Sequence, residues 1–101
     1  MKPVIISQAA NEDHRDITDY IAKDNQGAAL RFGDELFAAG RARGWLPSAG
    51  NRRTDVTENL YTFPYGQHVI IYSIEPDHVL IRRIVHGARR IDRILAEAAK
   101  R

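Results

Sequence analysis

The segment VLIRRIVH, residues 79–86, decides the fold of this chain of 101 residues. It is rich in valine and isoleucine, which favour strands, and Gly87 ends it. Its mixed apolar character predicts a central strand whose two faces are both largely covered. Two more strands precede it, at 60–63 and 67–74, and each intervening turn contains a proline. The second half of the chain therefore predicts a meander of strands.

The first half of the chain predicts a short strand followed by two helices. The strand covers residues 3–7, and Ser7 is placed to cap the first helix because its oxygen can accept from unpaired backbone N–H groups. The turn at 24–27 ends this helix, and a second helical pattern runs from about 28 to 43. Helices joined so briefly must lie antiparallel. The buried side of the first helix is expected to carry Ala10, Ile17, Tyr20 and Ile21.

Helices that are segregated from a run of strands indicate an α+β fold. We expect an N-terminal strand, an antiparallel two-helix hairpin packed on one face of an antiparallel β-sheet, and a short C-terminal helix over residues 91–99. Trp45 is expected to fill the open end of the hairpin, and the other face of the sheet to be open or partly open. Residues 1–101 are few enough to form one domain with one modest core.

Composition narrows the class of protein. The chain is 44% hydrophobic and 28% charged, as ordinary globular domains are, and it contains no cysteine for a disulfide or a thiolate metal site. No apolar run approaches the roughly 20 residues that span a bilayer. The N-terminal stretch is typical of a strand rather than of a signal peptide. We therefore expect a cytoplasmic protein without a membrane partner.

The positive charge of the chain is concentrated in its second half. Residues 44–101 carry nine lysines and arginines against six acidic residues, whereas residues 1–43 carry six against seven. Twelve of the fifteen basic residues are arginine, whose planar fork matches carboxylates and phosphates. This distribution favours an anionic partner, either an acidic protein segment or a nucleic acid. The alternative is a solvated surface with ordinary ion pairs.

One histidine and several arginines are candidates for chemistry. Because side chains alternate along a strand, Arg82 and His86 are expected on one face, with Ile84 between them. Such a cluster can hold a phosphate, or cleave one with His86 as general acid or base. Alternatively, His86 is structural and Arg82 or Arg83 pairs with an acidic neighbour at position 58, 75 or 77. The basic residues that complete the candidate cluster are Arg52, Arg53, Arg89 and Arg90.

Other mechanisms find no support in the sequence. It has no glycine-rich phosphate loop, no serine nucleophile elbow and no zinc-ligand spacing. His68, His78 and His86 lie on or beside neighbouring strands, but no feature of the sequence fixes their register. We expect neither a metal nor a cofactor.

Five blocks of the sequence, in order, resemble the ParE-type toxins of the RelE/ParE superfamily. The most specific is VLIRRIVHGARR, residues 79–90, a strand that ends in His-Gly-Ala-Arg. The others resemble the first and second helices of the family, its loop of proline, glycine and arginine, and its central strands; they are residues 7–22, 28–36, 47–53 and 60–72.

The resemblance implies the toxin of a type II toxin–antitoxin pair. In the ParE branch the implied target is DNA gyrase, and in the RelE branch the implied activity is cleavage of messenger RNA on the ribosome. The fold does not choose between them. No lysine lies between Lys23 and Lys100, and a glycine rather than an aromatic residue follows His86. These features favour the non-enzymatic ParE branch. A ribonuclease would use Arg82, His86 and Arg53.

The resemblance also implies a partner, a ParD-like antitoxin that forms a hetero-oligomer with the chain. Its disordered acidic C-terminal segment would fold on the toxin, with apolar anchors beside the helical hairpin and carboxylates on arginines. The residues expected to bind the antitoxin are Phe32, Leu36, Trp45, Arg83 and Arg89. Those expected to bind the target are Arg52, Arg53, Arg82, His86, Arg89 and Arg90.

Overall fold

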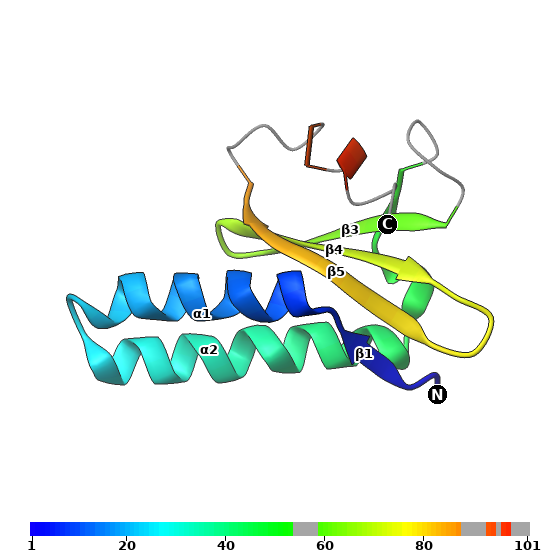
Figure 1. Cartoon of the computed structure of the whole chain (residues 1–101). Coiled ribbons are helices and arrows are strands. Elements are labelled where there is room, and N and C mark those ends of the chain that lie inside the picture. Colours follow the sequence, from blue (N-terminus) through cyan, green and yellow to red (C-terminus); the bar gives the residue numbers. More distant parts are fainter. Residues whose placement is uncertain (54–58, 88–92, 95, 98–101) are drawn as a thin grey trace.

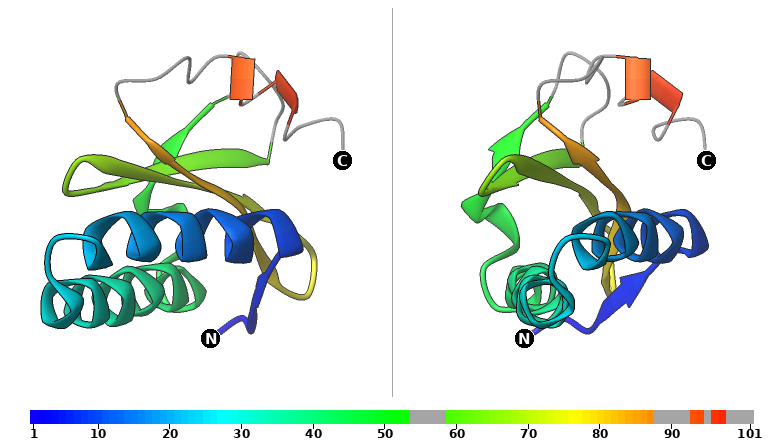
Figure 2. Two further views of the ribbon diagram at one scale, coloured as in Figure 1. Left: turned by 60° about the vertical axis from the view of Figure 1, so that its left-hand side comes forward. Right: turned by 90° about the vertical axis from the view of Figure 1, so that its left-hand side faces the viewer.

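The computed structural model describes residues 1–53, 59–87, 93–94 and 96–97. A helical hairpin forms one layer and a five-stranded sheet the other (Figures 1 and 2). The predicted α+β class is confirmed. Within the described ranges, no helix is long and apolar enough to cross a membrane. The elements are β1 (Val4–Ile6), α1 (Gln8–Ala22), α2 (Gln26–Arg41), η1 (Ala42–Gly44), η2 (Pro47–Ala49), β2 (Asn51–Arg52), β3 (Leu60–Tyr65), β4 (His68–Ile74) and β5 (Val79–His86).

The sheet has the order β1-β5-β4-β3-β2, and all its pairs are antiparallel except β1 with β5. Val4 lies opposite Val79 in that parallel pair. The predicted antiparallel sheet is therefore confirmed, with one parallel pair at its β1 edge. A tight turn forces its two strands to be antiparallel, but β1 reaches β5 only after the whole hairpin and meander. β5 becomes a central strand, as its apolar sequence predicted.

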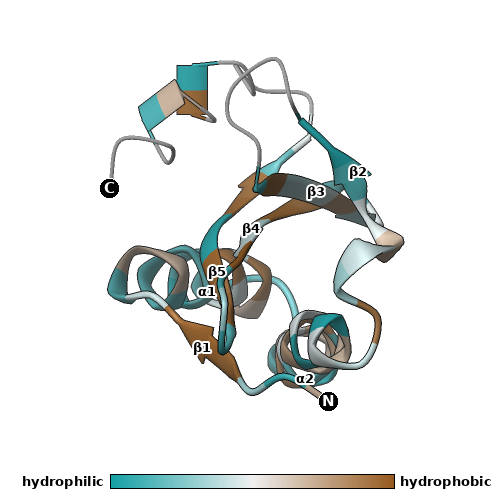
Figure 3. Cartoon of the chain, turned by 90° about the vertical axis from the view of Figure 1, so that its right-hand side faces the viewer, coloured by the Kyte–Doolittle hydropathy of each residue, from teal (hydrophilic) through white to brown (hydrophobic). Residues whose placement is uncertain are grey.

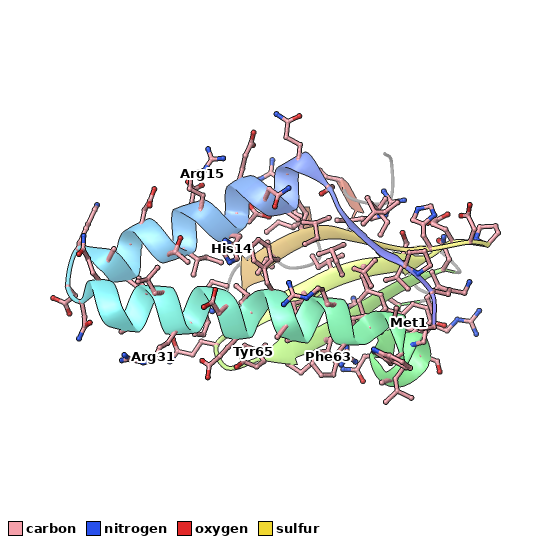
Figure 4. The ribbon with its side chains drawn as sticks, turned by 90° about the horizontal axis from the view of Figure 1, so that it is seen from below. Met1, His14, Arg15, Arg31, Phe63 and Tyr65 are labelled. Atoms are coloured by element: carbon pink, nitrogen blue, oxygen red, sulfur yellow. The ribbon has the colours of Figure 1, made fainter. Side chains whose placement is uncertain are left out.

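The two helices begin at side-chain caps and pack closely. The N–H of Ala10 donates to the Ser7 hydroxyl oxygen at 3.1 Å, as predicted, and Asn25 caps α2 in the same way. Gly33 allows the helices to approach, because a Cβ there would lie 2.9 Å from the methyl carbon of Thr18. His14 lies between the helices in Figure 4, and its Nε2–H donates to the Gly33 carbonyl oxygen at 2.9 Å.

Both faces of the sheet carry apolar clusters. The larger lies against the helices, and the smaller, on the other face, contacts Val69 and Ile94. The second face is thus partly covered. Figure 3 shows the largely hydrophobic strands β3 and β4, in brown, beside the two helices. Tyr20, predicted to be buried, is 75% exposed, because it lies near the tip of the hairpin, beyond the core of the sheet. The larger cluster contains Ala10, Leu36, Ile70, Tyr72, Val79, Ile81 and Ile84; the smaller contains Leu60, Ile71 and Val85.

An irregularity in β5 resets the alternation of its side chains. Ile71 lies opposite Arg83, but the next residue of β4, Tyr72, lies opposite Ile81. Arg82 is therefore the extra residue of a β-bulge. As a result, Ile81 and Ile84 both join the cluster against the helices, although they are three residues apart. The predicted terminal helix over 91–99 lies mostly outside the described residues.

Candidate functional site

The bulge separates the two residues expected to act together in catalysis. The Nε of Arg82 donates to the Ser73 hydroxyl at 2.9 Å, and Ser73 lies on the sheet face opposite to the helices. His86 lies opposite His68 and lines a groove with residues of both helices. The prediction that Arg82 and His86 share a face was therefore wrong, because strict alternation fails where one strand has an extra residue.

Arg82 has a second internal contact. Its Nη2 lies 3.7 Å from Glu75 Oε2, and both side chains are largely buried. The sequence analysis offered pairing with an acidic neighbour as the alternative to a catalytic role for this arginine. The contact with Glu75 confirms that pairing. Arg82 therefore has a role in joining β4 to β5.

Arg83 forms a two-point pair with Asp13 of α1. Its Nε lies 2.7 Å from Asp13 Oδ2 and its Nη2 lies 3.0 Å from Oδ1. The hydrogen bond to Asp13 raises the pKa of Arg83, while partial burial opposes the shift. Because its fork is engaged inside the chain, Arg83 does not present the expected carboxylate-binding geometry to an antitoxin. Asp13 was not predicted as a partner, although it shares the buried stripe of the helix with Ala10 and Ile17.

A groove of about 740 Å³ lies between the hairpin and the ends of β4 and β5. Phe32 contributes an aromatic wall, with its ring 5.4 Å from His68 and 5.9 Å from Tyr65. Leu36, which was also expected to bind an antitoxin, is fully buried in the core one helical turn further on. It supports the hairpin and is not available to a partner. The groove is lined by Asp16, Ile17, Tyr20, Ile21, Phe32, Gln67, His68 and His86.

Two histidines meet in this groove. The rings of His68 and His86 lie 5.6 Å apart, edge to face. Burial, followed by the nearby His86, lowers the pKa of His68. His78 lies beyond β4, where its Nδ1 is 2.7 Å from Asp77 Oδ1. Within the part of the chain that the structure describes, no three histidine, cysteine or acidic side chains gather to hold a metal.

Trp45 lies in an exposed apolar patch and does not fill the end of the hairpin. Its side chain is 71% exposed, and Leu46 beside it is 65% exposed. The N–H of Lys2 donates to the Gly44 carbonyl at 3.0 Å, which brings the exposed Met1 to the same end of α2 (Figure 4). The predicted filling of the hairpin was wrong because small residues close it: a Cβ on Gly44 would overlap the Lys2 carbonyl. The side chain of Trp45 therefore stays largely exposed to solvent.

Arg52 and Arg53 lie at the opposite edge of the sheet from β1. Arg52 is in β2, opposite Tyr61, and the N–H of Arg53 donates to the Leu60 carbonyl at 2.8 Å. Three strand spacings, about 14 Å, separate β2 from β5. Both arginines take part in further interactions within the chain. Arg89 and Arg90 lie outside the described residues.

Comparisons with known proteins agree with this fold. A chain from a solved structure entitled "Chromosomal ParDE TA system from P. aeruginosa" superposes with a TM-score of 0.73, covering 85% of this chain and 96% of that chain at 16% identity. No curated protein sequence matches the chain. The sequence model for the ParE toxin of the type II toxin–antitoxin system, parDE, matches residues 4–91. Fold and sequence together define a toxin of the type II class. The chain belongs to the ParE toxin family.

Proposed function

We propose that the chain is a toxin that binds DNA gyrase, blocks replication and is neutralised by a cognate ParD-like antitoxin. We choose binding over cleavage because of the bulge in β5. It leaves Arg82 and His86 on opposite faces of the sheet. Arg53, the third candidate, lies beyond β2, three strands away.

Separation of these groups matters because acid–base catalysis requires its groups within hydrogen-bond reach of one substrate. A binding toxin has no such requirement. It needs only a surface of complementary shape and charge, over which contacts can be spread. Arg52 of β2, which is exposed, and Arg53 directly after it place two positive charges of this kind at the edge of the sheet.

The antitoxin in this proposal occupies the groove beside the hairpin. Ile17, Ile21 and Phe32 offer an apolar floor for an amphipathic segment. Trp45 supplies a second, exposed anchor at the far end of α2. A disordered segment that folds on binding can span both positions. The fold of the ParDE structure from P. aeruginosa supports a partner of this class.

One observation favours the alternative, a RelE-like ribonuclease that cleaves messenger RNA on the ribosome. His68 and His86 meet in a groove that Asp16 also lines, and the lowered pKa of His68 would keep it neutral and able to accept a proton. This set differs from the predicted Arg82, His86 and Arg53. It would place any cleavage in the groove rather than on the other face of the sheet.

The test is to express the chain and follow gyrase activity and message integrity in the same cells. The proposal expects relaxed plasmid and intact transcripts, with supercoiling restored when the antitoxin is co-expressed. A variant that combines His68→Gln with His86→Gln serves as the control. Because both histidines line the groove that this proposal gives to the antitoxin, and not the edge at Arg52, the variant should still relax plasmid. Cut transcripts that become intact in this variant would establish the ribonuclease instead.

A further inference from the structure

Tyr72 of the central strand β4 is fully buried, yet its hydroxyl reaches the loop before β2. The hydroxyl donates to the Pro47 carbonyl at 2.6 Å and accepts from the Gly50 N–H at 3.0 Å. Both hydrogen-bonding functions of the phenol are thus used on one short stretch of loop. Burial raises the pKa of this hydroxyl, so that it remains a neutral donor at physiological pH.

The loop is shaped to accept this hydroxyl. A Cβ on Gly50 would lie 2.5 Å from the Tyr72 hydroxyl oxygen and 2.7 Å from the Thr62 carbonyl. Gly50 has an extended backbone, with φ −79° and ψ 179°, so space rather than conformation requires glycine there. Asn51 and Arg52 follow directly as β2 and pair with β3. The position of Gly50 therefore sets where β2 begins.

Arg43 at the end of α2 adds a third element to the cluster. Its side chain is buried, with the guanidinium carbon 3.7 Å from the centre of the Phe63 ring. Its Nε donates to the Ala39 carbonyl at 3.2 Å. Its positive charge lowers the pKa of the Tyr72 hydroxyl, against the larger effect of burial. The loop is thus held between the end of α2 and the middle of the sheet.

We propose that Tyr72 is a positioning residue for target binding, which fixes the loop at Pro47 and Gly50 and thereby sets where Arg52 and Arg53 are presented. This inference rests on the proposed function, in which these two arginines contact the target. Tyr72 itself is buried in the fold and contacts no target. Its effect passes through the loop alone.

The test compares Tyr72→Phe with Tyr61→Phe. The two rings stack with centroids 5.5 Å apart, and among the described residues no hydrogen bond involves the Tyr61 hydroxyl. Tyr72→Phe should raise the toxin concentration for half-inhibition of gyrase by roughly tenfold, because two loop groups lose their partner. Tyr61→Phe should leave it unchanged. Antitoxin affinity, which depends on the groove and on Trp45 outside the Pro47–Gly50 loop, should match wild type in both variants.

Two readouts separate positioning from a general loss of stability. Hydrogen exchange of the Gly50 N–H should become faster in Tyr72→Phe under conditions where the protein stays folded. In a double-mutant cycle, Tyr72→Phe should add no further loss of inhibition once Arg52 and Arg53 are both alanine. Additive effects, wild-type inhibition by Tyr72→Phe, or unchanged Gly50 exchange would each overturn the inference.

The same experiments distinguish a wrong target from a wrong role for Tyr72. If the wild-type chain leaves gyrase active, the target assignment fails, and the same cycle is then read on growth arrest. Non-additive loss of growth arrest with faster Gly50 exchange would retain the positioning role toward another target. Absence of both gyrase inhibition and growth arrest by the wild-type chain would overturn both proposals.

Discussion

Asp13 of α1 holds Arg83 of β5 by two parallel contacts and also accepts the N–H of Ile84 at 2.9 Å. One carboxylate thus satisfies a guanidinium and a backbone donor beside the bulge. Its side chain is 14% exposed and that of Arg83 is 31% exposed. This contact fixes the first helix on the sheet where the alternation of β5 is reset.

Replacing Asp13 with alanine should lower the free energy of unfolding by about 2–3 kcal/mol, because a charged partner and a backbone acceptor are lost together. Exposure of Arg83 keeps the loss below that of a fully buried pair. Urea unfolding measures the change, and Asp16→Ala on the same helix is the control, with a change within about 0.5 kcal/mol. Equal stability of the two variants would contradict a structural role for the pair.

Acid should destabilise the protein through His68. Its pKa in the folded chain lies below the ordinary value, so the unfolded chain binds the proton more readily. Stability is therefore lost as the pH falls through about 6.5 toward the lower pKa of the folded state. His68→Phe should flatten the dependence of stability on pH between 7 and 5, whereas His78→Gln should not. The comparison needs only denaturation midpoints across this window.

Phe32 and Leu36 lie one helical turn apart and should differ in their effects. Phe32→Ala should weaken antitoxin binding by about tenfold or more, because an aromatic wall of the groove is lost. Leu36→Ala should instead lower stability by about 2–5 kcal/mol, because it leaves a cavity in the core. Calorimetric titration and unfolding of both variants give the two quantities. A normal antitoxin affinity for Phe32→Ala would place the antitoxin elsewhere.

Trp45→Ala should leave the free energy of unfolding within about 0.5 kcal/mol, because the side chain is largely exposed. It should still weaken antitoxin binding, since exposed tryptophans are frequent anchors of interfaces. Leu30→Ala is the matched control, because Leu30 is also 71% exposed but lies on the outer side of the hairpin. If both variants bind the antitoxin equally well, the patch around Trp45 serves no antitoxin.

Much of the fold was predictable because local chemistry fixes it. Ser7 caps the first helix as expected, and the observed bounds of β5 are those predicted from the apolar run at 79–86. Capping and strand formation depend on neighbours in the sequence, so short patterns carry them. The brief turn after α1 likewise left the two helices only an antiparallel arrangement.

The site was less predictable because long-range register fixes it. No pattern in β5 announces the bulge at Arg82, which depends on how β4 pairs with it. Tyr72 and Arg43 were not singled out, although Arg43 lies seven residues after Leu36 and so falls on the buried face of the helical pattern. A buried arginine on such a face was the signal available.

The central claim, that the chain acts by binding gyrase, is tested most directly by titrating purified toxin into a DNA supercoiling reaction. If the chain binds gyrase, supercoiling should be lost once the toxin concentration becomes comparable to that of gyrase, and added antitoxin should restore it. Full supercoiling at a large molar excess of folded toxin would contradict the account.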